Sequence, residues 1–260
     1  MSLVGEERKA IILNLLNLEG KVKTNDLVER LQVSSETVRR YLEEMEAENK
    51  LRKVYGGAIK IKHDREEPSH FKREVLWAEE KKRIGAAAAK LVQEGDVIVI
   101  DDGTTPLQMI PALSGIGRLT IVTPSITALS LLVQLQNQGM FDGDIYFIGG
   151  KVNAKHYRVA GSIAEKMMAN FHVDKAFISI DGITHKSATS FDSDKSQLGR
   201  QFVDHADETI VLADHSKIGA NTFYRICDLK EIDTIVCNVP APEEWKTELG
   251  KKDINWIVAE

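Results

Sequence analysis

The sequence of 260 residues is poor in cysteine, with only Cys227 and Cys237, and neither has metal-ligand residues at a useful spacing. This scarcity argues against a disulfide framework, so we expect both cysteines to be reduced residues that pack in the interior. Long apolar runs are also missing, because no stretch approaches the length of a bilayer span. The N-terminus lacks the basic, apolar and small-residue order of a signal peptide. We therefore expect a cytoplasmic protein with no membrane partner, no cofactor and no metal ion.

Net positive charge is missing too, since the formal net charge is −5 at pH 7. This value at first argues against a nucleic-acid partner, but the distribution of charge matters more than its sum. Residues 1–62 hold 12 Lys and Arg against 10 Asp and Glu, whereas the remaining residues hold 22 against 29. Within residues 39–62 there are seven basic and four acidic residues. This gradient permits DNA binding at the N-terminal end but is weak evidence alone.

Composition and length favour a globular protein of two domains. Hydrophobic residues make up 43% and charged residues 28%, which is ordinary for a soluble fold with a sizeable core. The local sequence pattern changes after a charged stretch that contains Pro68, so we expect a linker there. The predicted division is a domain at 1–61, a linker at 62–73 and a second domain at 74–260.

Residues 6–61 predict three helices followed by a β-hairpin. Apolar residues repeat at helical spacing in 6–18, which ends at Gly20, and again after Thr24 and after Ser34, both of which can cap a helix. Strand-like runs at 51–55 and 58–61 flank Gly56-Gly57, a two-residue turn that tolerates positive φ. Three helices with such a hairpin predict a winged helix-turn-helix.

The third helix and the hairpin carry the side chains that this motif places against DNA. Its helix enters the major groove and projects N-terminal side chains toward base edges. Arg can bind guanine through two hydrogen bonds, and Ser or Thr can bond to bases or phosphates. We predict that double-stranded DNA is contacted by the helix-capping Ser34, by Ser35, Thr37 and Arg40 at bases, and by Arg39, Arg52, Lys53 and Tyr55 at phosphates. The alternative is a protein-interaction module or a dimerisation wing.

Beyond residue 74, helical stretches alternate with short β-rich runs, which predicts a mostly parallel sheet covered by helices. The expected strands are 97–101, 119–123, 145–148, 176–181, 209–213, 234–237 and 256–259. The expected helices lie near 78–93, 105–114, 125–136, 161–170, 194–206 and 242–249.

A possible anion site lies where Asp101 ends a strand and Gly103-Thr104-Thr105 opens a helix. Free backbone N–H groups and the positive end of the helix dipole favour a phosphate there. Ligands of open α/β sheets gather at the carboxyl ends of strands. We predict effector binding by residues at such ends, namely Asp101, Asp102, Gly103, Thr104, Thr105, Thr123, Asp181 and Lys217. A merely capped turn at 103–105 and a solvated loop lysine at 217 remain alternatives.

Ordered motifs along nearly the whole chain resemble the DeoR family of bacterial transcription regulators. They are Val33 to Arg40, Leu51 to Ala58, Glu79 to Ile84, Asp101 to Thr105, Val122 to Ser125, Gly149-Gly150, Phe177 to Gly182 and Leu212 to Gly219. The resemblance implies a C-terminal α/β sensor domain related in fold to ribose-5-phosphate isomerase and to CoA transferases. It also implies a repressor of a carbohydrate-utilisation operon, controlled by a phosphorylated sugar or similar small anion, and a homo-oligomer.

Three departures from the family pattern bear on function. Tyr41 stands where Asp is common, Asp102 where Ser is usual and Pro124 where Asn is usual. A carboxylate near a phosphate weakens binding unless it points away or pairs with a cation such as Lys217. We therefore expect that the effector is atypical or that the anion is not a simple sugar phosphate.

Two other functions compete with the regulator. One is a sugar-phosphate isomerase with an appended DNA-binding module, in which Asp181 would be the general base and Lys217 its electrophilic support. The other is an architectural DNA-binding oligomer without a ligand. Asp214-His215-Ser216 is not a catalytic triad, because consecutive residues cannot align base, nucleophile and orienting group. We expect no catalysis.

Overall fold

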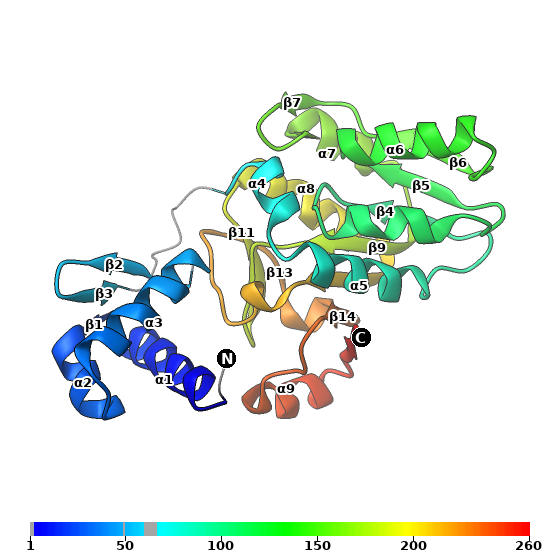
Figure 1. Ribbon diagram of the computed structural model, residues 1–260. Coiled ribbons are helices and arrows are strands. Elements are labelled where there is room, and N and C mark those ends of the chain that lie inside the picture. Colours follow the sequence, from blue (N-terminus) through cyan, green and yellow to red (C-terminus); the bar gives the residue numbers. More distant parts are fainter. Residues whose placement is uncertain (1–2, 49, 60–66) are drawn as a thin grey trace. The chain divides into compact units, whose positions relative to one another are not determined.

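The computed structural model describes residues 3–48, 50–59 and 67–260, and the chain forms two compact units, 1–65 and 66–260 (Figure 1). Each unit has its own hydrophobic core. No helix among these described residues is long and apolar enough to cross a membrane.

The N-terminal unit is a three-helix bundle edged by a small antiparallel sheet. Its sheet has the order β1-β3-β2, and its core lies between the three helices around Ile12, Leu27 and Leu42. The predicted helices and hairpin are confirmed, while the short strand β1 was not predicted. The elements are α1 (Leu3–Glu19), β1 (Lys21–Lys23), α2 (Thr24–Leu31), α3 (Ser35–Ala47), β2 (Arg52–Val54) and β3 (Gly57–Ile59).

The hairpin turn lies one residue earlier than predicted. Val54 pairs with Gly57, so the two turn residues are Tyr55 and Gly56, and Gly56 has a φ of +80°. Gly57 belongs to β3, where an added Cβ would lie 2.0 Å from the carbonyl oxygen of Val22. The second glycine thus permits close packing of β3 on β1, a feature that the sequence pattern did not reveal. The end of the predicted strand, residues 60–61, lies outside the described residues, as does Asn49 at the predicted helix end.

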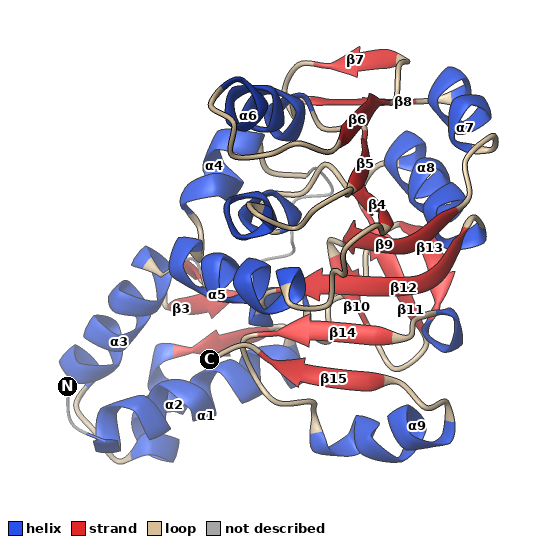
Figure 2. Ribbon diagram, turned by 90° about the vertical axis from the view of Figure 1, so that its right-hand side faces the viewer, coloured by secondary structure: helices blue, strands red, loops and turns tan. Residues whose placement is uncertain are grey.

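The C-terminal unit is built on a parallel seven-stranded sheet with the order β15-β14-β12-β9-β4-β5-β6 (Figure 2). All seven predicted strands are confirmed, with small shifts at their ends. They are β4 (Val97–Ile100), β5 (Thr120–Thr123), β6 (Asp144–Phe147), β9 (Val173–Ser179), β12 (Ala206–Ala213), β14 (Thr234–Cys237) and β15 (Asn255–Val258).

Helices cover both faces of this sheet, as the alternation of elements predicted. One face packs against α5 (Ala78–Ala89), η1 (Pro106–Leu113) and α6 (Ile126–Asn137), and the other against α7 (Ser162–Met168), α8 (Ser193–Asp204) and α9 (Lys246–Lys251). The expected helix at 105–114 is a 3₁₀ helix that contains two prolines. Five short strands were not predicted: β7 (Lys151–Asn153), β8 (Arg158–Ala160), β10 (Gly182–Ile183), β11 (Ser187–Ser190) and β13 (Tyr224–Asp228).

The strand order reverses between β4 and β9. From β4 the chain proceeds outward through β5 and β6, then returns to β9 beside β4 and continues outward on the other side. At such a reversal the connections diverge to opposite faces, which leaves a crevice at the carboxyl ends of the two strands. The loops after β4 and β9 therefore face each other.

The predicted linker at 62–73 differs from the structure at its C-terminal end. Residues 60–66 lie outside the described part of the chain, but α4 (His70–Val75) occupies the end of the predicted range. Glu67, His70 and Arg73 are buried. A charged, proline-containing stretch indicated solvent exposure. In the structure the charges are buried, because Glu67 pairs with Arg73 and with Arg158 of the same unit.

Candidate functional site

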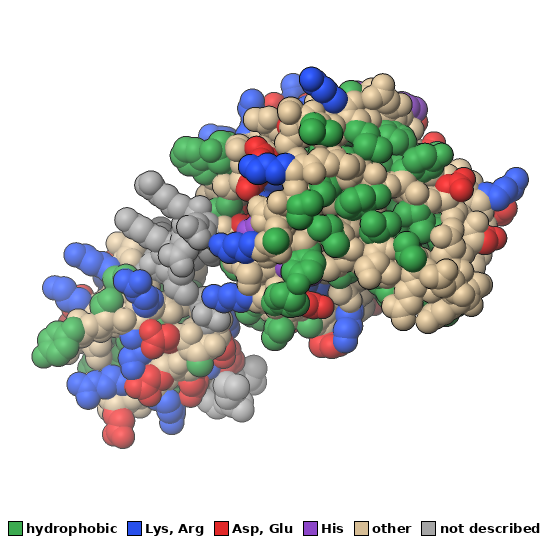
Figure 3. Space-filling view, turned by 90° about the horizontal axis from the view of Figure 1, so that it is seen from above, with side chains coloured by type: hydrophobic (Ala, Val, Ile, Leu, Met, Phe, Trp, Pro, Cys, Tyr) green, Lys and Arg blue, Asp and Glu red, His purple; other side chains and the backbone are tan. Residues whose placement is uncertain are grey.

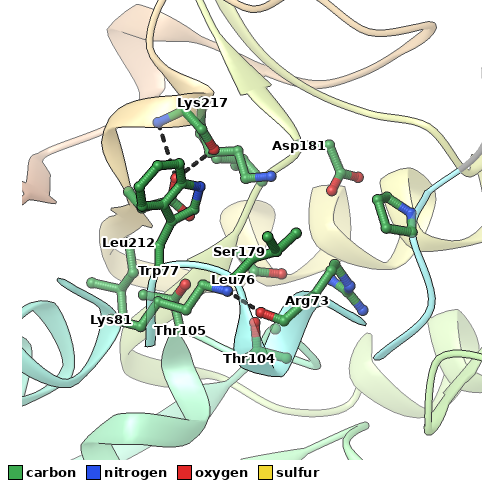
Figure 4. A pocket seen from close by; sticks show the side chains of 15 residues that line it. Arg73, Leu76, Trp77, Lys81, Thr104, Thr105, Ser179, Asp181, Leu212 and Lys217 are labelled. Carbon is green, nitrogen blue, oxygen red and sulfur yellow. Dashed lines mark hydrogen bonds between the residues drawn. The ribbon is translucent and has the colours of Figure 1, made fainter. Parts of the chain in front are cut away.

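A pocket opens at the reversal of strand order and encloses about 520 Å³, including its mouth (Figure 4). Its walls come from the loops after β4, β9 and β12 and from the segment that contains α4. The lining residues are Pro68, Arg73, Leu76, Trp77, Lys81, Gly103, Thr104, Thr105, Ser179, Ile180, Asp181, Leu212, Asp214, Ser216 and Lys217.

The loop after β4 presents unused hydrogen-bond donors to the pocket. Among the described residues, neither the backbone N–H groups of Gly103, Thr104 and Thr105 nor the two threonine hydroxyls form a hydrogen bond. An added Cβ at Gly103 would lie 2.3 Å from Cβ of Ser179, so only glycine fits between the two loops. Free donors at a turn that opens a helix form a cradle for an anion.

Three cations surround this loop: Lys217, Lys81 and Arg73. Lys81 is buried and donates to the backbone carbonyl of Arg73. Burial, together with the charges of Lys217 and Arg73, lowers the pKa of Lys81 to about 8 despite the nearby Asp214. Mutual repulsion of this kind is relieved when an anion binds between the cations.

Asp181 supplies a carboxylate on the opposite wall. Its Oδ2 accepts hydrogen bonds from Oγ of Ser190 at 2.7 Å and from the N–H of Phe191 at 3.2 Å, and lies 3.4 Å from Nζ of Lys195. Burial opposes ionisation of Asp181, but Lys195, Lys217 and the Ser190 hydrogen bond outweigh it and lower its pKa to about 2. The group is ionised at neutral pH and suits acceptance of hydrogen bonds from ligand hydroxyls.

Asp101, Asp102 and Thr123 were predicted to bind the effector, but they do not line the pocket. Asp101 lies behind the β4 loop and accepts from the N–H and Oγ of Ser179, both at 2.8 Å, so it joins the ends of β4 and β9. Burial and the charge of Asp102 raise the pKa of Asp101 to about 7. Thr123 is buried and donates to the carbonyl of Ile100.

Asp102 pairs with a cation that the sequence did not suggest. Its Oδ2 lies 3.1 Å from NH1 of Arg158, not beside Lys217. Burial opposes ionisation of Asp102, but Arg158, Lys195 and Arg73 outweigh burial and hold its pKa below the usual range. The carboxylate is therefore neutralised by Arg158 and does not line the pocket.

Several pocket residues were missed by sequence reasoning, chiefly Arg73, Trp77, Lys81 and Ser179. Lys81 and Ser179 each lie within a motif that carried the family resemblance, and these two had a usable sequence signal. Arg73 lay inside the predicted linker, and its burial depends on pairing with Glu67. Ser179 was predicted only as part of a strand. Gly103, Thr104, Thr105, Asp181 and Lys217 are brought together as expected, and their binding of an effector stays a prediction.

The N-terminal unit presents the other candidate site, on α3 and the β2–β3 hairpin. Ser34 caps α3, since its Oγ accepts from the N–H of Thr37 at 3.2 Å and lies 3.0 Å from the Thr37 hydroxyl. Ser35 and Arg39 are exposed on the same helix, and Tyr55 is fully exposed at the hairpin tip. The helix thus offers polar side chains at its N-terminal end and a hairpin beside it.

The cations of this surface differ in their availability. Arg39 and Arg52 are exposed and have no ion-pair partner among the described residues. Nζ of Lys53 lies 2.7 Å from Oε1 of Glu43, so part of its charge is neutralised within the unit. Arg40 lies 3.7 Å from a carboxylate oxygen of Glu44 and 5.7 Å from the centre of the Tyr41 ring. Arg39 and Arg52 are therefore the cations of this surface that are exposed and without an ion pair among the described residues, and their contact with phosphates stays a prediction.

Tyr41, the departure from the family pattern on α3, is part of the core. The side chain is 6% exposed and packs among the residues that hold the three helices together. Arg40, which precedes it, is exposed. The tyrosine therefore contributes to the core of the N-terminal unit and not to its surface.

The described residues of the two sites do not form the donor set of a metal centre. Within the described ranges, no group of three or more His, Cys, Asp or Glu residues is arranged to bind a metal ion. Both cysteines are free and buried, as predicted, and burial raises the pKa of Cys227 to about 12 and of Cys237 to about 11.

Comparison with known proteins identifies the class. Residues 8–64 match the DeoR-like helix-turn-helix domain, and residues 77–238 match the DeoR C terminal sensor domain. A chain with these two domains is a DNA-binding transcription regulator with a domain that senses a small molecule, and not an enzyme.

The chain belongs to the DeoR family. It is 31% identical to the HTH-type transcriptional repressor GlcR of Bacillus subtilis over 98% of this chain and 96% of that protein. It is 29% identical to the lactose phosphotransferase system repressor of Staphylococcus epidermidis over 86% and 88% of the two chains. Among solved structures it is similar to ribose 5-phosphate isomerase A of Methanocaldococcus jannaschii, with 19% identity and a TM-score of 0.39 over 55% of each chain, which is too distant to support any functional argument.

Proposed function

We propose that the protein represses a carbohydrate-utilisation operon and that a phosphorylated sugar in the pocket controls its binding to operator DNA. The observation that carries the proposal is the cradle of free N–H and hydroxyl donors at 103–105, surrounded by Lys81, Lys217 and Arg73. Such donors suit a phosphate. Asp181 on the other wall suits sugar hydroxyls. The names of the two repressor relatives support the regulated pathway and the sign of control.

The DNA-binding part of the proposal is supported by the exposed side chains of α3 and the hairpin. We assign phosphate contacts to Arg39 and Arg52 and base contacts to Ser35, Thr37 and Arg40. Lys53, Ser34 and Thr37 remain in the DNA-binding set as weaker contributors, because their polar groups are engaged within the unit. Tyr55 at the hairpin tip completes the set.

We further propose a homo-oligomer that acts in the bacterial cytoplasm, where operator DNA lies. Large apolar side chains are exposed on α4 and along α6 and the turn after it, among them Phe71, Val75, Val133 and Met140. The view from above shows hydrophobic side chains on the surface of the larger unit (Figure 3). Exposed apolar surface supports an interaction between copies of the chain, and paired winged domains match the symmetry of operators with two half-sites.

The test measures DNA binding and ligand binding in the same preparation. A mobility-shift assay uses the DNA upstream of the protein's own operon, with a panel of sugar phosphates and the matching free sugars. The protein should bind this DNA sequence-selectively, and one phosphorylated sugar should release the protein from the DNA. Lys217→Gln should weaken binding of that sugar phosphate by about tenfold or more, since one charged hydrogen bond is removed, and leave DNA affinity unchanged. Lys230→Gln, a surface lysine on η3 (Leu229–Glu231), is the matched control.

Arg40→Ala provides the corresponding test at the DNA surface. It should weaken specific binding more than non-specific binding, since a bidentate base contact contributes about 1–3 kcal/mol of discrimination. Absence of sequence-selective binding, or equal response to free and phosphorylated sugars, would refute the proposal.

A further inference from the structure

The segment 67–77 links the pocket to the point at which the C-terminal unit begins. It contributes four lining residues, Pro68, Arg73, Leu76 and Trp77. It lies mostly outside both family matches, because the helix-turn-helix match ends at residue 64 and the sensor match begins at residue 77. A ligand that fills the pocket therefore touches the stretch that follows the DNA-binding unit in the chain.

Contacts hold this segment at both ends. Glu67, which is 4% exposed, has its carboxylate 2.8 Å from NH1 of Arg158, 2.8 Å from NH1 of Arg73 and 3.8 Å from Nζ of Lys195. At the other end the Trp77 ring packs edge-on against the His215 ring, with centroids 4.3 Å apart. The segment is thus docked onto the C-terminal unit through a buried charge cluster and an aromatic contact.

Arg73 is incompletely satisfied in this arrangement. The side chain is 7% exposed, and while NH1 pairs with Glu67, the buried Nε and NH2 have no hydrogen-bond partner among the described residues. A buried charged donor without a partner is unfavourable. Arg73 lines the pocket together with Lys81 and Thr104 (Figure 4), so an anion there can accept from it.

The backbone at Trp77 also indicates that docking is conditional. Trp77 joins α4 to α5 with a φ of +58°, in the left-handed region. A non-glycine residue keeps this conformation only where the surrounding structure holds it. Without the packing around Arg73 and Trp77, the junction would be free to relax.

We infer that Arg73 is an anion-binding residue and that a bound anion holds the segment 67–77 against the pocket. This inference rests on the proposed function of the pocket and adds to it the route by which occupancy is sensed. A ligand shifts an equilibrium toward the state that it binds better. Because the anion contacts Arg73 only when the segment is docked, binding favours docking. Docking of the segment also fixes the position of Glu67. This residue lies three positions after residue 64, where the helix-turn-helix match ends.

Hydrogen exchange of the full chain tests the inference, with inorganic phosphate as the probe and chloride at equal ionic strength as the reference. In α4 the N–H of Arg73 donates to the carbonyl of Ser69 and that of Leu76 to the carbonyl of Lys72. Exchange at these two amides should slow as phosphate saturates the pocket. Unchanged or faster exchange there, with phosphate bound, overturns the inference.

Variants separate Arg73 from the other cations of the pocket. Arg73→Gln should weaken phosphate binding by about tenfold or more, and saturating phosphate should no longer slow exchange in α4. Lys217→Gln should also bind phosphate more weakly, yet saturation should still slow exchange in α4. Lys72→Gln, an exposed cation on the same helix, should behave like the parent chain. Arg73→Lys, which keeps the charge beside Glu67 but removes the two free donors, is the second variant if Arg73→Gln does not fold.

The outcomes distinguish the inference from the function beneath it. If phosphate binds in a manner that depends on Lys217 while Arg73→Gln and Arg73→Lys bind as tightly as the parent, Arg73 is not an anion ligand and the pocket proposal stands. If phosphate protects no residue around the pocket, both fall.

Discussion

Arg158→Met is the most informative perturbation of the buried charge cluster. Arg158 is 1% exposed, and its guanidinium lies 2.8 Å from Glu67, 3.1 Å from Asp102 and 3.2 Å from Asp192. Removal of one partner from a buried pair costs about 3–5 kcal/mol, because the remaining charge is uncompensated. We expect about 3 kcal/mol, at the lower end of that range, since Arg73 and Lys195 remain beside Glu67.

Thermal unfolding gives the readout. All three tryptophans, Trp77, Trp245 and Trp256, lie in the C-terminal unit, so their fluorescence reports on that unit alone. For a domain of this size 1 kcal/mol shifts the midpoint by about 2–4 °C. Arg158→Met should therefore lower the midpoint at pH 7 by roughly 6–12 °C.

The pH dependence separates the effect of charge pairing from the effect of packing. In the folded parent chain the pKa of Asp102 lies below the pKa that this group has in the unfolded chain. The ionised carboxylate therefore stabilises the fold at pH values above the unfolded pKa, and this contribution disappears as pH falls through the folded pKa. Without Arg158, burial dominates and the pKa of Asp102 should rise above its usual range. The destabilisation should then grow as pH rises from about 4.5 to 7 and shrink as pH falls.

Arg118→Met is the matched control, because Arg118 forms an exposed pair with Glu94. Exposed pairs contribute little to stability, so its midpoint should stay close to that of the parent chain. A destabilisation below about 1 kcal/mol for Arg158→Met, or one of equal size at both pH values, would show that the cluster does not depend on Arg158 for charge balance.

Two further predictions concern the DNA surface and the pocket. Arg39→Ala should reduce the slope of log affinity against log salt concentration by about 0.9 for each phosphate that the protein no longer neutralises. Fluorescence anisotropy on operator and random DNA measures this slope, and Lys53→Ala should change it less because Glu43 already pairs with that ammonium. Equal slopes for Arg39→Ala and the parent chain would contradict the assignment of Arg39 to a phosphate. Affinity for sulfate, an anion whose own charge is constant in this range, should fall as pH rises through the pKa of Lys81 at about 8, by up to about tenfold between pH 7 and pH 9, since one unit above its pKa one ammonium in ten keeps its proton. Calorimetric titration at each pH measures this affinity. In Lys81→Gln the affinity should change less between pH 7 and pH 9, and an equally large change in that variant would show that a group other than Lys81 is titrating.

Much of the fold follows from local sequence pattern. The seven strands of the large sheet are short β-branched runs that alternate with helical periodicity, and each contains its own signal. The strands that were missed, such as β10 and β13, are short or pair with segments distant in the chain. Their existence depends on tertiary pairing, which no local window contains.

The pocket was predictable in part for the same reason. Gly103, Thr104 and Thr105 follow a recognisable strand, so their place at its carboxyl end could be inferred. Asp102 could not be placed, because its partner Arg158 lies 56 residues away in a hairpin that was not predicted. Arg73 was overlooked because the charges around it indicated a linker.

The sequence by itself determined the order of the main helices and of the seven strands of the large sheet, the two-domain organisation of the family and the place of the loop at 103–105, because periodicity, caps and glycine positions act over a few residues. The tertiary structure decided which charged side chains line the pocket and which are neutralised in buried ion pairs outside it. Glu67, Asp102 and Arg158 are far apart in the chain and carry no local mark of burial. Their pairing is favourable only once the sheet has brought them together in a medium of low polarity, where a charge without a partner is costly.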